Sequence, residues 1–417
     1  MTPSPLPYNR NWLLTAGINL CIVALLGCLL RYLFVGDVPG LDYRNVLHAH
    51  SHFAFGGWLM LVLITLLTAA FVPQERWRTR RYNRPFWTGQ VACVGMLCSF
   101  PVQGYGAVSI AFSTLLIIAS VWFAIIFIKD SRTTAYAFPL KWARWALIYM
   151  LLSSVAPFTL GPIMATGNSG TPLYYNAIYF YLHFQYNGWF TFAVLSLFFY
   201  TLERQQIQFN KAAASQAFRW LNIACIPAYL LSVLWTQPPA VVYVLAGIAA
   251  GMQVAGTVYL ISSIAPGRAQ LQHWLNGWGL VLWSIAGIAF ISKVLLQLMS
   301  AWPLAAKWAY HYRSFIIGYL HLVLLGFITC FLLGYLIQHG MLRITGKVTR
   351  LLLVVFLAGL FANEAVLFAH GMVSLLGGYL AGVNILLLAA ALLLFAGTLG
   401  IAGGIRGRRG FLPGNTS

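Results

Sequence analysis

Long apolar stretches separated by short polar connectors run through the whole sequence. Each stretch is close to the roughly 20 residues that an α-helix needs to cross a bilayer. We therefore predict an all-α fold, a polytopic membrane bundle of about twelve transmembrane helices that forms a single domain over residues 1–417. The predicted helices lie near 11–35, 48–72, 86–103, 105–129, 139–160, 175–201, 213–236, 239–264, 273–300, 312–340, 347–371 and 378–403.

Basic residues are distributed unevenly among the connectors. If the helices alternate in direction, most Lys and Arg residues fall on one side of the membrane, and only Arg31, Arg44, Lys307 and Arg313 fall on the other. Cytoplasmic loops carry the excess of Lys and Arg in membrane proteins. The pattern therefore predicts that both termini are cytoplasmic, in a multi-pass protein of a bacterial inner membrane.

Composition agrees with a membrane protein. Hydrophobic residues make up 60% of the chain and charged residues 7%, whereas a soluble domain carries roughly a quarter charged residues. Basic cytoplasmic loops account for the net charge of +19, so we expect a lipid bilayer and no nucleic acid as partner. The six cysteines form no CxxCH or CxxC spacing, which argues against covalently attached haem and against a disulfide framework.

Three histidines at alternate positions open the second apolar stretch, in the sequence His48-Ala-His50-Ser-His52. An imidazole that leaves water needs a partner, and histidine is a common ligand of haem and of metal ions. At about 100° per residue on a helix, His48 and His52 share one face and His50 points to the other side. One helix could therefore serve two cofactors, or the three rings could be interfacial side chains bonded to carbonyls and water.

The predicted topology places most ionisable residues of the helices in one half of the membrane. These residues are His48, His50, His52, His183, His311, His321, His370, Lys293 and Glu364. Ionisable residues inside a membrane usually mark a functional site, so we expect several helices to contribute to one site. Lys293 and Glu364 would otherwise be unpaired deep in lipid, and we expect them to form an ion pair.

Three short motifs carry a resemblance to a known family. They are the histidine cluster of the second stretch, His183-Phe-Gln-Tyr-Asn187-Gly in the sixth and Tyr319-Leu-His321 in the tenth. With the twelve predicted helices, they make the chain similar to subunit I of the haem-copper oxidase and nitric oxide reductase superfamily. The resemblance implies a low-spin haem b held by His321 and by His50 or His52. It also implies a copper or non-haem iron bound through His183, and Arg313 lies where haem propionates would emerge.

The sequence departs from the family pattern at several positions. The seventh helix has no histidine where the family has a pair, and Tyr319 stands where the ligand of a high-spin haem is expected. Asn187 replaces a carboxylate of the reductases, and Tyr186 is one position short of the oxidase tyrosine. The candidate ligands of a second metal are therefore His48, His183, His311 and His370, and the candidate catalytic side chains are Glu364, Tyr186 and Asn187.

Three functions are compatible with these patterns. The first is an oxidoreductase similar to a terminal oxidase or nitric oxide reductase, which reduces or binds a small diatomic gas. Its electrons would come from a quinol or a cytochrome, and the cytochrome could be an accessory subunit. The second is a non-catalytic membrane protein that binds haem or nitric oxide or relays electrons. The third is a twelve-helix transporter. The first is favoured. We expect no proton pumping, because no chain of acidic residues leads inward from the cytoplasm.

Overall fold

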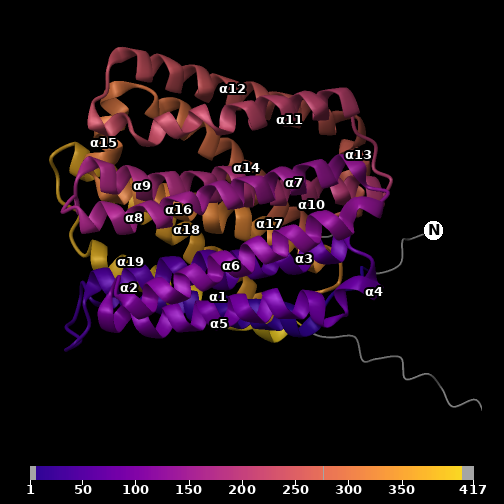
Figure 1. Cartoon of the computed structure of the whole chain (residues 1–417), viewed down its shortest axis with the longest axis horizontal. Helices are drawn as coiled ribbons and strands as arrows, with labels where there is room; N and C mark the ends of the chain where they lie inside the picture. Colours follow the sequence, from indigo (N-terminus) through magenta and orange to yellow (C-terminus); the bar gives the residue numbers. More distant parts are fainter. Residues whose placement is uncertain (1–5, 276, 406–417) are drawn as a thin grey trace, which may run out of the picture.

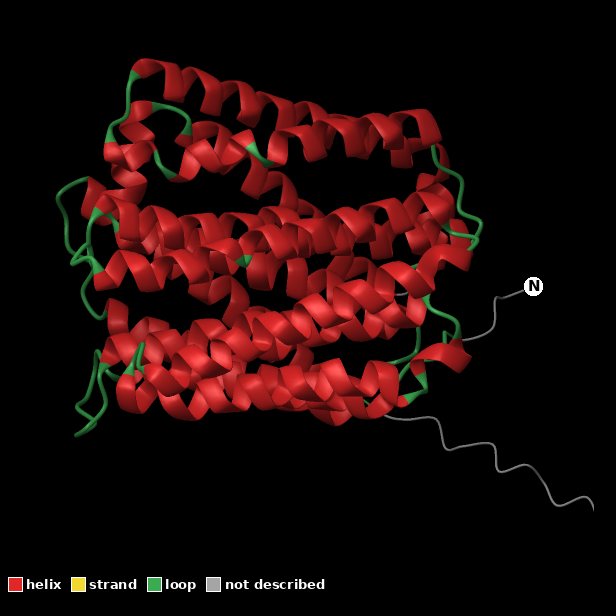
Figure 2. Cartoon of the chain, viewed as in Figure 1, coloured by secondary structure: helices red, strands yellow, loops and turns green. Residues whose placement is uncertain are grey.

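The computed structural model describes residues 6–275 and 277–405 as an assembly of helices (Figure 1). The helices run side by side along the longest axis of the molecule, and loops join them at the two ends (Figure 2).

The first half comprises α1 (Arg10–Tyr32), α2 (Tyr43–His52), the π-helix η1 (Phe53–Met60), α3 (Leu61–Phe71), α4 (Gln74–Trp77), α5 (Arg80–Gln103), α6 (Ala107–Asp130), the 3-10 turn η2 (Ser131–Thr133), α7 (Ala137–Ser153), α8 (Val155–Ala165), α9 (Pro172–His183), the π-helix η3 (Phe184–Phe190) and α10 (Thr191–Arg204). The second half comprises α11 (Lys211–Cys225), the 3-10 turns η4 (Pro227–Ser232) and η5 (Leu234–Thr236), α12 (Ala240–Ile264), the 3-10 turn η6 (Ala265–Gly267), α13 (Arg268–Trp274), α14 (Gly277–Ser300), α15 (Pro303–His311), α16 (Arg313–His321), the π-helix η7 (Leu322–Thr329), α17 (Cys330–Gln338), α18 (Lys347–Leu375) and α19 (Val383–Gly404).

Nine helical segments within the described residues are long and apolar enough to cross a membrane. They confirm the prediction of an all-α, multi-pass membrane fold. The other three predicted segments, near 86–103, 175–201 and 213–236, are also helical but fall outside that set. One of them breaks where Pro227 follows α11, because proline lacks the N–H that a helix interior requires.

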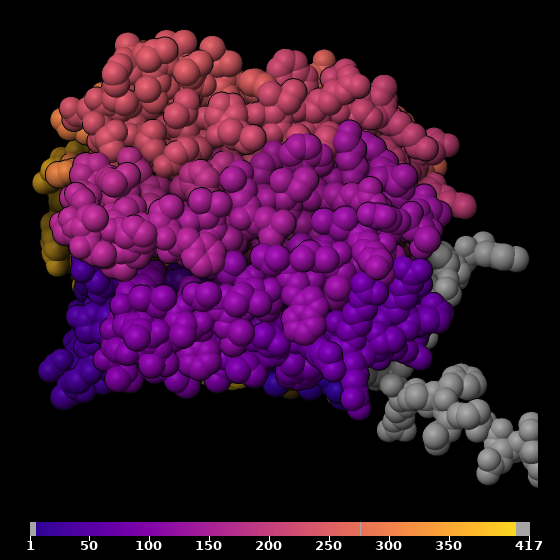
Figure 3. All heavy atoms as spheres, in the orientation of Figure 1, coloured from indigo at the N-terminus to yellow at the C-terminus, as the bar shows by residue number. Residues whose placement is uncertain are grey.

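The surface of the bundle is apolar enough to suit a bilayer. Large aliphatic side chains face outward on several helices, with exposed fractions of 66% for Ile288, 59% for Val258 and 56% for Val91. Side chains fill the spaces between neighbouring ribbons on the face that Figure 3 shows. Lipid tails can solvate such a surface, and the helices satisfy their own backbone hydrogen bonds.

The first and last described helices meet at one end of the bundle, which is also the end where α4 lies (Figure 1). Gly17 near the start of α1 lies against Ala402 and Ile405 at the end of α19. At the same place the amide of Arg343 donates to the carbonyl of Gly404 at 3.0 Å. The chain therefore enters and leaves the bundle on one side, and α15 lies at the opposite end.

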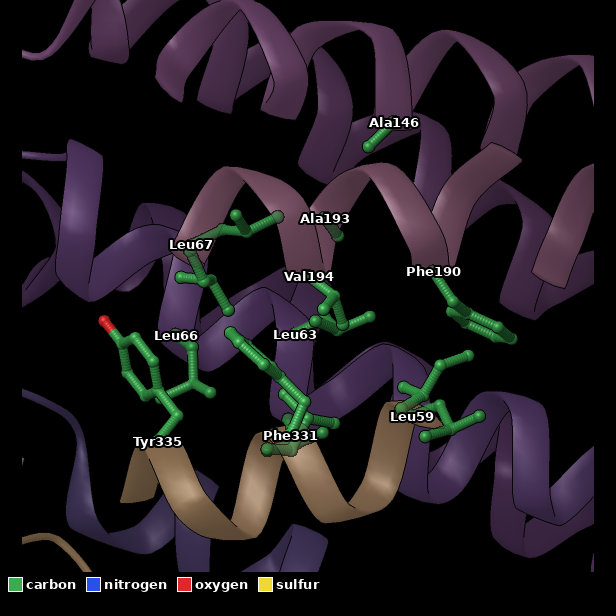
Figure 4. Packing of buried hydrophobic residues seen from close by; sticks show 14 of the residues in the cluster. Leu59, Leu63, Leu66, Leu67, Ala146, Phe190, Ala193, Val194, Phe331 and Tyr335 are labelled. Carbon is green, nitrogen blue, oxygen red and sulfur yellow. The ribbon is translucent and has the colours of Figure 1, made fainter. Parts of the chain in front are cut away.

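The core forms where the second, sixth and tenth helical segments meet. Figure 4 shows leucines of the second segment, Phe190 and Val194 of the sixth and Phe331 of the tenth pointing into the space between them. The indole nitrogen of Trp58 donates to the hydroxyl of Thr329 at 3.1 Å, which ties the second segment to the tenth. The three segments that carry the histidine motifs are thus packed directly against one another.

A glycine allows α19 to pack closely against α18. A Cβ atom added at Gly397 would lie 2.6 Å from both the Cα and the backbone nitrogen of Phe356. Because backbone atoms cannot move aside, Gly397→Ala forces the two helices apart, and overpacking of this kind costs about 1–3 kcal/mol. We expect the variant to unfold at a lower temperature than the wild type in mild detergent.

Gly403 on the same helix provides the control for Gly397→Ala. A Cβ atom added there meets nothing within 4 Å, and alanine has a higher helix propensity than glycine. Gly403→Ala should therefore unfold at or above the wild-type temperature. Equal thermal stability of the two variants would contradict the close packing of α18 and α19.

Candidate functional site

Each of the three histidine motifs leads directly into a π-helix. His52 precedes η1, His183 precedes η3 and His321 precedes η7, and these are the three π-helices of the described residues. A π-helix is rare and appears frequently at functional sites. The backbone thus distinguishes the same three stretches that the histidines distinguish.

The three motifs also share the spacing between the histidine and the residues that follow it, a repeat that the sequence analysis missed. A glycine follows each of these histidines after five residues and an aromatic residue follows after six, as Gly57 and Trp58, Gly188 and Trp189, and Gly326 and Phe327. A Cβ atom at Gly188 would lie 2.6 Å from the ring carbon Cγ of Tyr149, so this glycine lets η3 approach α7 closely. The repeated spacing is visible in the sequence and could have shown that the three helices are related.

His50 of α2 and His321 of α16 lie within electrostatic range of one another. Each ring is fixed through Nδ1, which bonds to the carbonyl of Val23 at 3.1 Å in His50 and to the carbonyl of Ile317 at 2.9 Å in His321. A carbonyl can only accept, so Nδ1 carries a proton in both rings, and in the neutral form of each ring Nε2 keeps its lone pair. Within the described residues, no hydrogen bond engages either Nε2. Two neutral imidazoles from different helices therefore offer free lone pairs in one region.

Arg31 of α1 adds a positive charge to this pair. Its guanidinium acts electrostatically on both His50 and His321. Arg313, predicted to lie near haem propionates, is exposed, and its charge acts on Tyr179 instead. An anionic group beside the two imidazoles would therefore be matched by Arg31.

His48 and His52 lie on the opposite side of the helix from His50, and both contact Tyr105. The Nε2 atom of His52 is 3.0 Å from the hydroxyl of Tyr105, and its ring stacks on Phe100 with centroids 4.7 Å apart. His48 packs edge-on against the Tyr105 ring at 4.6 Å. Tyr105 lies in the connection between α5 and α6, and burial, with a smaller contribution from nearby tyrosines, raises the pKa of its phenol. The phenol stays protonated and engages His52, which favours His50 as the partner of His321.

His183 has both ring nitrogens occupied. Nε2 bonds to the carbonyl of Cys225 at 2.8 Å, so it carries the proton, and Nδ1 accepts from the side-chain amide of Asn187 at 3.0 Å. The side chain is completely buried. In this arrangement His183 joins η3 to the end of α11 and has no lone pair free for a metal ion.

The other candidate metal ligands each have contacts of their own. His370 bonds to the hydroxyl of Ser314 at 2.8 Å, and His311 is exposed and packs edge-on against Tyr312. Across residues 6–275 and 277–405, no group of three or more His, Cys, Asp or Glu side chains could hold a metal ion. The structure thus does not assemble His48, His183, His311 and His370 into a site for copper or non-haem iron.

Lys293 and Glu364 do not form the predicted ion pair. Within the described part of the chain, the ion pairs join Asp130 to arginines. One carboxylate oxygen of Glu364 accepts from the Asn363 side chain at 3.2 Å, and the other is buried without a partner. The prediction was wrong because Lys293 points toward η3 and α11, where it lines a small cavity with Asn187, Cys225 and other residues.

That small cavity has a volume of about 20 Å³, which is enough for one water molecule. The side-chain oxygen of Asn187 and the side-chain nitrogen of Gln253 are both buried there without hydrogen-bond partners. The polar atoms and the Lys293 amine therefore converge on one point beside His183. This explains why polar residues cluster on the sixth helix without forming a metal site.

A second and larger cavity of about 490 Å³ lies next to the tenth helical segment. Tyr186 and Tyr319 both line it, with their rings edge-on and their centroids 5.8 Å apart. Tyr186, predicted as a candidate catalytic side chain, thus faces this cavity. It makes no hydrogen bond to the ring nitrogens of His183, which bond to Cys225 and Asn187.

The donor atoms of His50 and His321 are of the kind that a haem iron binds, whereas His183 of the sixth helix has no free donor atom for a second metal. His50 and His321 are neutral, anchored through Nδ1 and unengaged at Nε2, as axial ligands must be.

Comparison with known proteins adds no family: no protein-family model matches the chain, and no curated protein is significantly similar to it.

Proposed function

We propose that this chain is a membrane haem protein in which His50 and His321 are the axial ligands of a low-spin haem b, and that it relays electrons. The observation that carries the proposal is the pair of imidazoles, each held through Nδ1 by a carbonyl and each with Nε2 unengaged. A bound haem supplies one-electron chemistry by changing between the ferric and ferrous states.

The protein's own residues perform three tasks in this proposal. The carbonyls of Val23 and Ile317 fix the tautomer and the orientation of the two rings, which is how neighbouring groups usually support histidine ligands. Arg31 would compensate the negative charge of a propionate. The buried indole of Trp58 ties the second helical segment to the tenth through Thr329, which holds the two ligand-bearing helices together.

Electron relay is favoured over reduction of a gas, which is the oxidoreductase function favoured from the sequence. An iron held by both His50 and His321 would have no position left for a gas, and His183 has no free lone pair for a second metal. The resemblance to the haem-copper oxidase superfamily supports the haem ligands but does not supply the missing metal ligands. The proposed electron donor is a quinol or a cytochrome, the cytochrome as an accessory subunit.

The proposed membrane topology has twelve traverses, with both termini in the cytoplasm of a bacterial inner membrane. Support comes from the excess of basic residues at the connectors of one side. The meeting of α1 and α19 at one end of the bundle agrees with an even number of traverses.

Carbon monoxide distinguishes electron relay from gas reduction. We expect the spectrum of the reduced, purified protein to be unchanged by carbon monoxide, because this ligand needs an open iron position. The measurement is a difference spectrum of the reduced protein with and without the gas. A clear shift would show an open iron and would favour the gas-reducing or gas-binding function instead.

A further inference from the structure

The large cavity beside the tenth helical segment has the size and lining of a site for an organic ligand. Its volume of about 490 Å³ lies within the range of small-molecule sites, roughly 300–1,000 Å³. Aromatic and aliphatic side chains make up most of its wall, including Tyr179, Trp235 and Phe368. A flat, largely apolar molecule would be solvated well by such a wall.

Two polar atoms without partners point to the chemistry of that molecule. The side-chain oxygen of Gln297 on α14 and the hydroxyl of Tyr319 on α16 are both buried without hydrogen bonds, and both residues line the cavity. Gln297 is only 6% exposed, so bulk water does not satisfy it. A buried polar group without a partner is costly, and a ligand with two polar ends would satisfy both groups.

The cavity reaches the lipid-facing surface. Two of its lining residues, Met299 on α14 and Met372 on α18, are 62% and 49% exposed on helices that are apolar enough to span a membrane. Both methionines lie within three residues of the ends of their helices, so a ligand would enter at the edge of the bilayer. This favours a lipid-soluble molecule over a polar metabolite.

We infer that this cavity binds the head group of a lipid-soluble quinone or quinol. The hydroxyl of Tyr319 donates to one oxygen of a quinone. The carboxamide of Gln297 accepts from a quinol hydroxyl, or donates to a quinone oxygen after rotation, so it serves both oxidation states. The ring stacks among the aromatic side chains, and the isoprenoid tail leaves past Met299 and Met372.

The position of the cavity connects it to the proposed haem. Tyr319 lies two residues before His321 on the same helix, and Leu320 between them also lines the cavity. The inference rests on the proposed function only in naming the electron donor. Binding of the quinone itself needs no haem.

Equilibrium binding of decylubiquinone to the purified full-length chain tests this inference, with protein-free micelles as the blank. We expect saturable binding of one quinone per chain. Gln297→Leu and Tyr319→Phe should each weaken binding roughly tenfold, the effect of losing one buried hydrogen bond. Haem content is measured on the same samples.

Gln253→Leu is the matched control. Gln253 is 5% exposed and also has an unpartnered side-chain nitrogen, but it lines the small cavity beside Lys293. Its substitution should leave quinone affinity unchanged. Equal loss of affinity in Gln253→Leu and Gln297→Leu would mean that the effect is a general loss of structure and would overturn the site.

The remaining outcomes separate the quinone site from the proposed haem. Wild-type protein that contains haem but binds no quinone overturns the quinone site and leaves the haem proposal intact. Protein that binds quinone with the expected variant effects but lacks haem supports the site and removes the haem proposal. Two haems per chain, with one lost in Tyr319→Phe, would show that the cavity holds a haem and would overturn the quinone inference.

Discussion

Replacing either His50 or His321 with alanine should remove nearly all of the haem from the purified protein. Each ring supplies one of two axial bonds, and no other unengaged imidazole lies on the same side of the second helical segment. Alanine also releases the carbonyl of Val23 or Ile317 that held the ring. The measurement is the haem absorption per protein in each variant, compared with the wild type.

His48→Ala and His52→Ala are the matched controls, because they remove imidazoles from the same helix on its opposite face. Their rings contact Tyr105 rather than His321. Both variants should retain haem with the wild-type spectrum. If His52→Ala lost the haem while His50→Ala kept it, the assignment of the ligand to His50 would be wrong.

Asp130→Asn should clearly lower the stability of the protein, by an amount comparable with that of Gly397→Ala. The carboxylate of Asp130 is 2% exposed and pairs with Arg76 at 3.1 Å and with Arg81 at 3.4 Å. It joins the end of α6 to α4 and α5 at the end of the bundle where basic residues accumulate. Breaking a buried pair costs about 3–5 kcal/mol, and the cost here is smaller, about 2 kcal/mol, because both guanidinium groups can reach water. Thermal unfolding in mild detergent measures the effect.

Glu75→Gln provides the comparison for Asp130→Asn. Glu75 lies on α4 next to Arg76 in sequence, but it is exposed and takes no part in the ion pairs of the described residues. Its substitution removes the same charge from the same region and should leave the unfolding temperature unchanged. Equal shifts for both variants would show that net charge, and not the buried pair, sets the stability of this end.

Hydropathy alone predicted most of the fold. All twelve predicted stretches are helical in the described residues, because a long apolar run has few alternatives to a helix in a membrane. It did not predict the three π-helices, since one extra residue in a turn leaves the hydropathy pattern unchanged. It also did not predict the break after α11, although Pro227 marks the position.

The candidate site was predicted in part. Helical spacing correctly separated His50 from His48 and His52, because the angle between positions on one helix follows from geometry. The sequence could not show which side chains on different helices meet. Lys293 therefore points toward Asn187 and Cys225 rather than toward Glu364, and His183 is held by Cys225 and Asn187.

The central claim is that His50 and His321 hold a haem, and a reduced-minus-oxidised absorption spectrum of the wild-type protein tests it most directly. The protein would be produced in haem-replete cells, purified in mild detergent and assayed for haem per chain. We predict the sharp bands of a low-spin haem b. A colourless protein that is folded and still carries its thermal transition would contradict the claim, and the twelve-helix transporter would then be the surviving alternative.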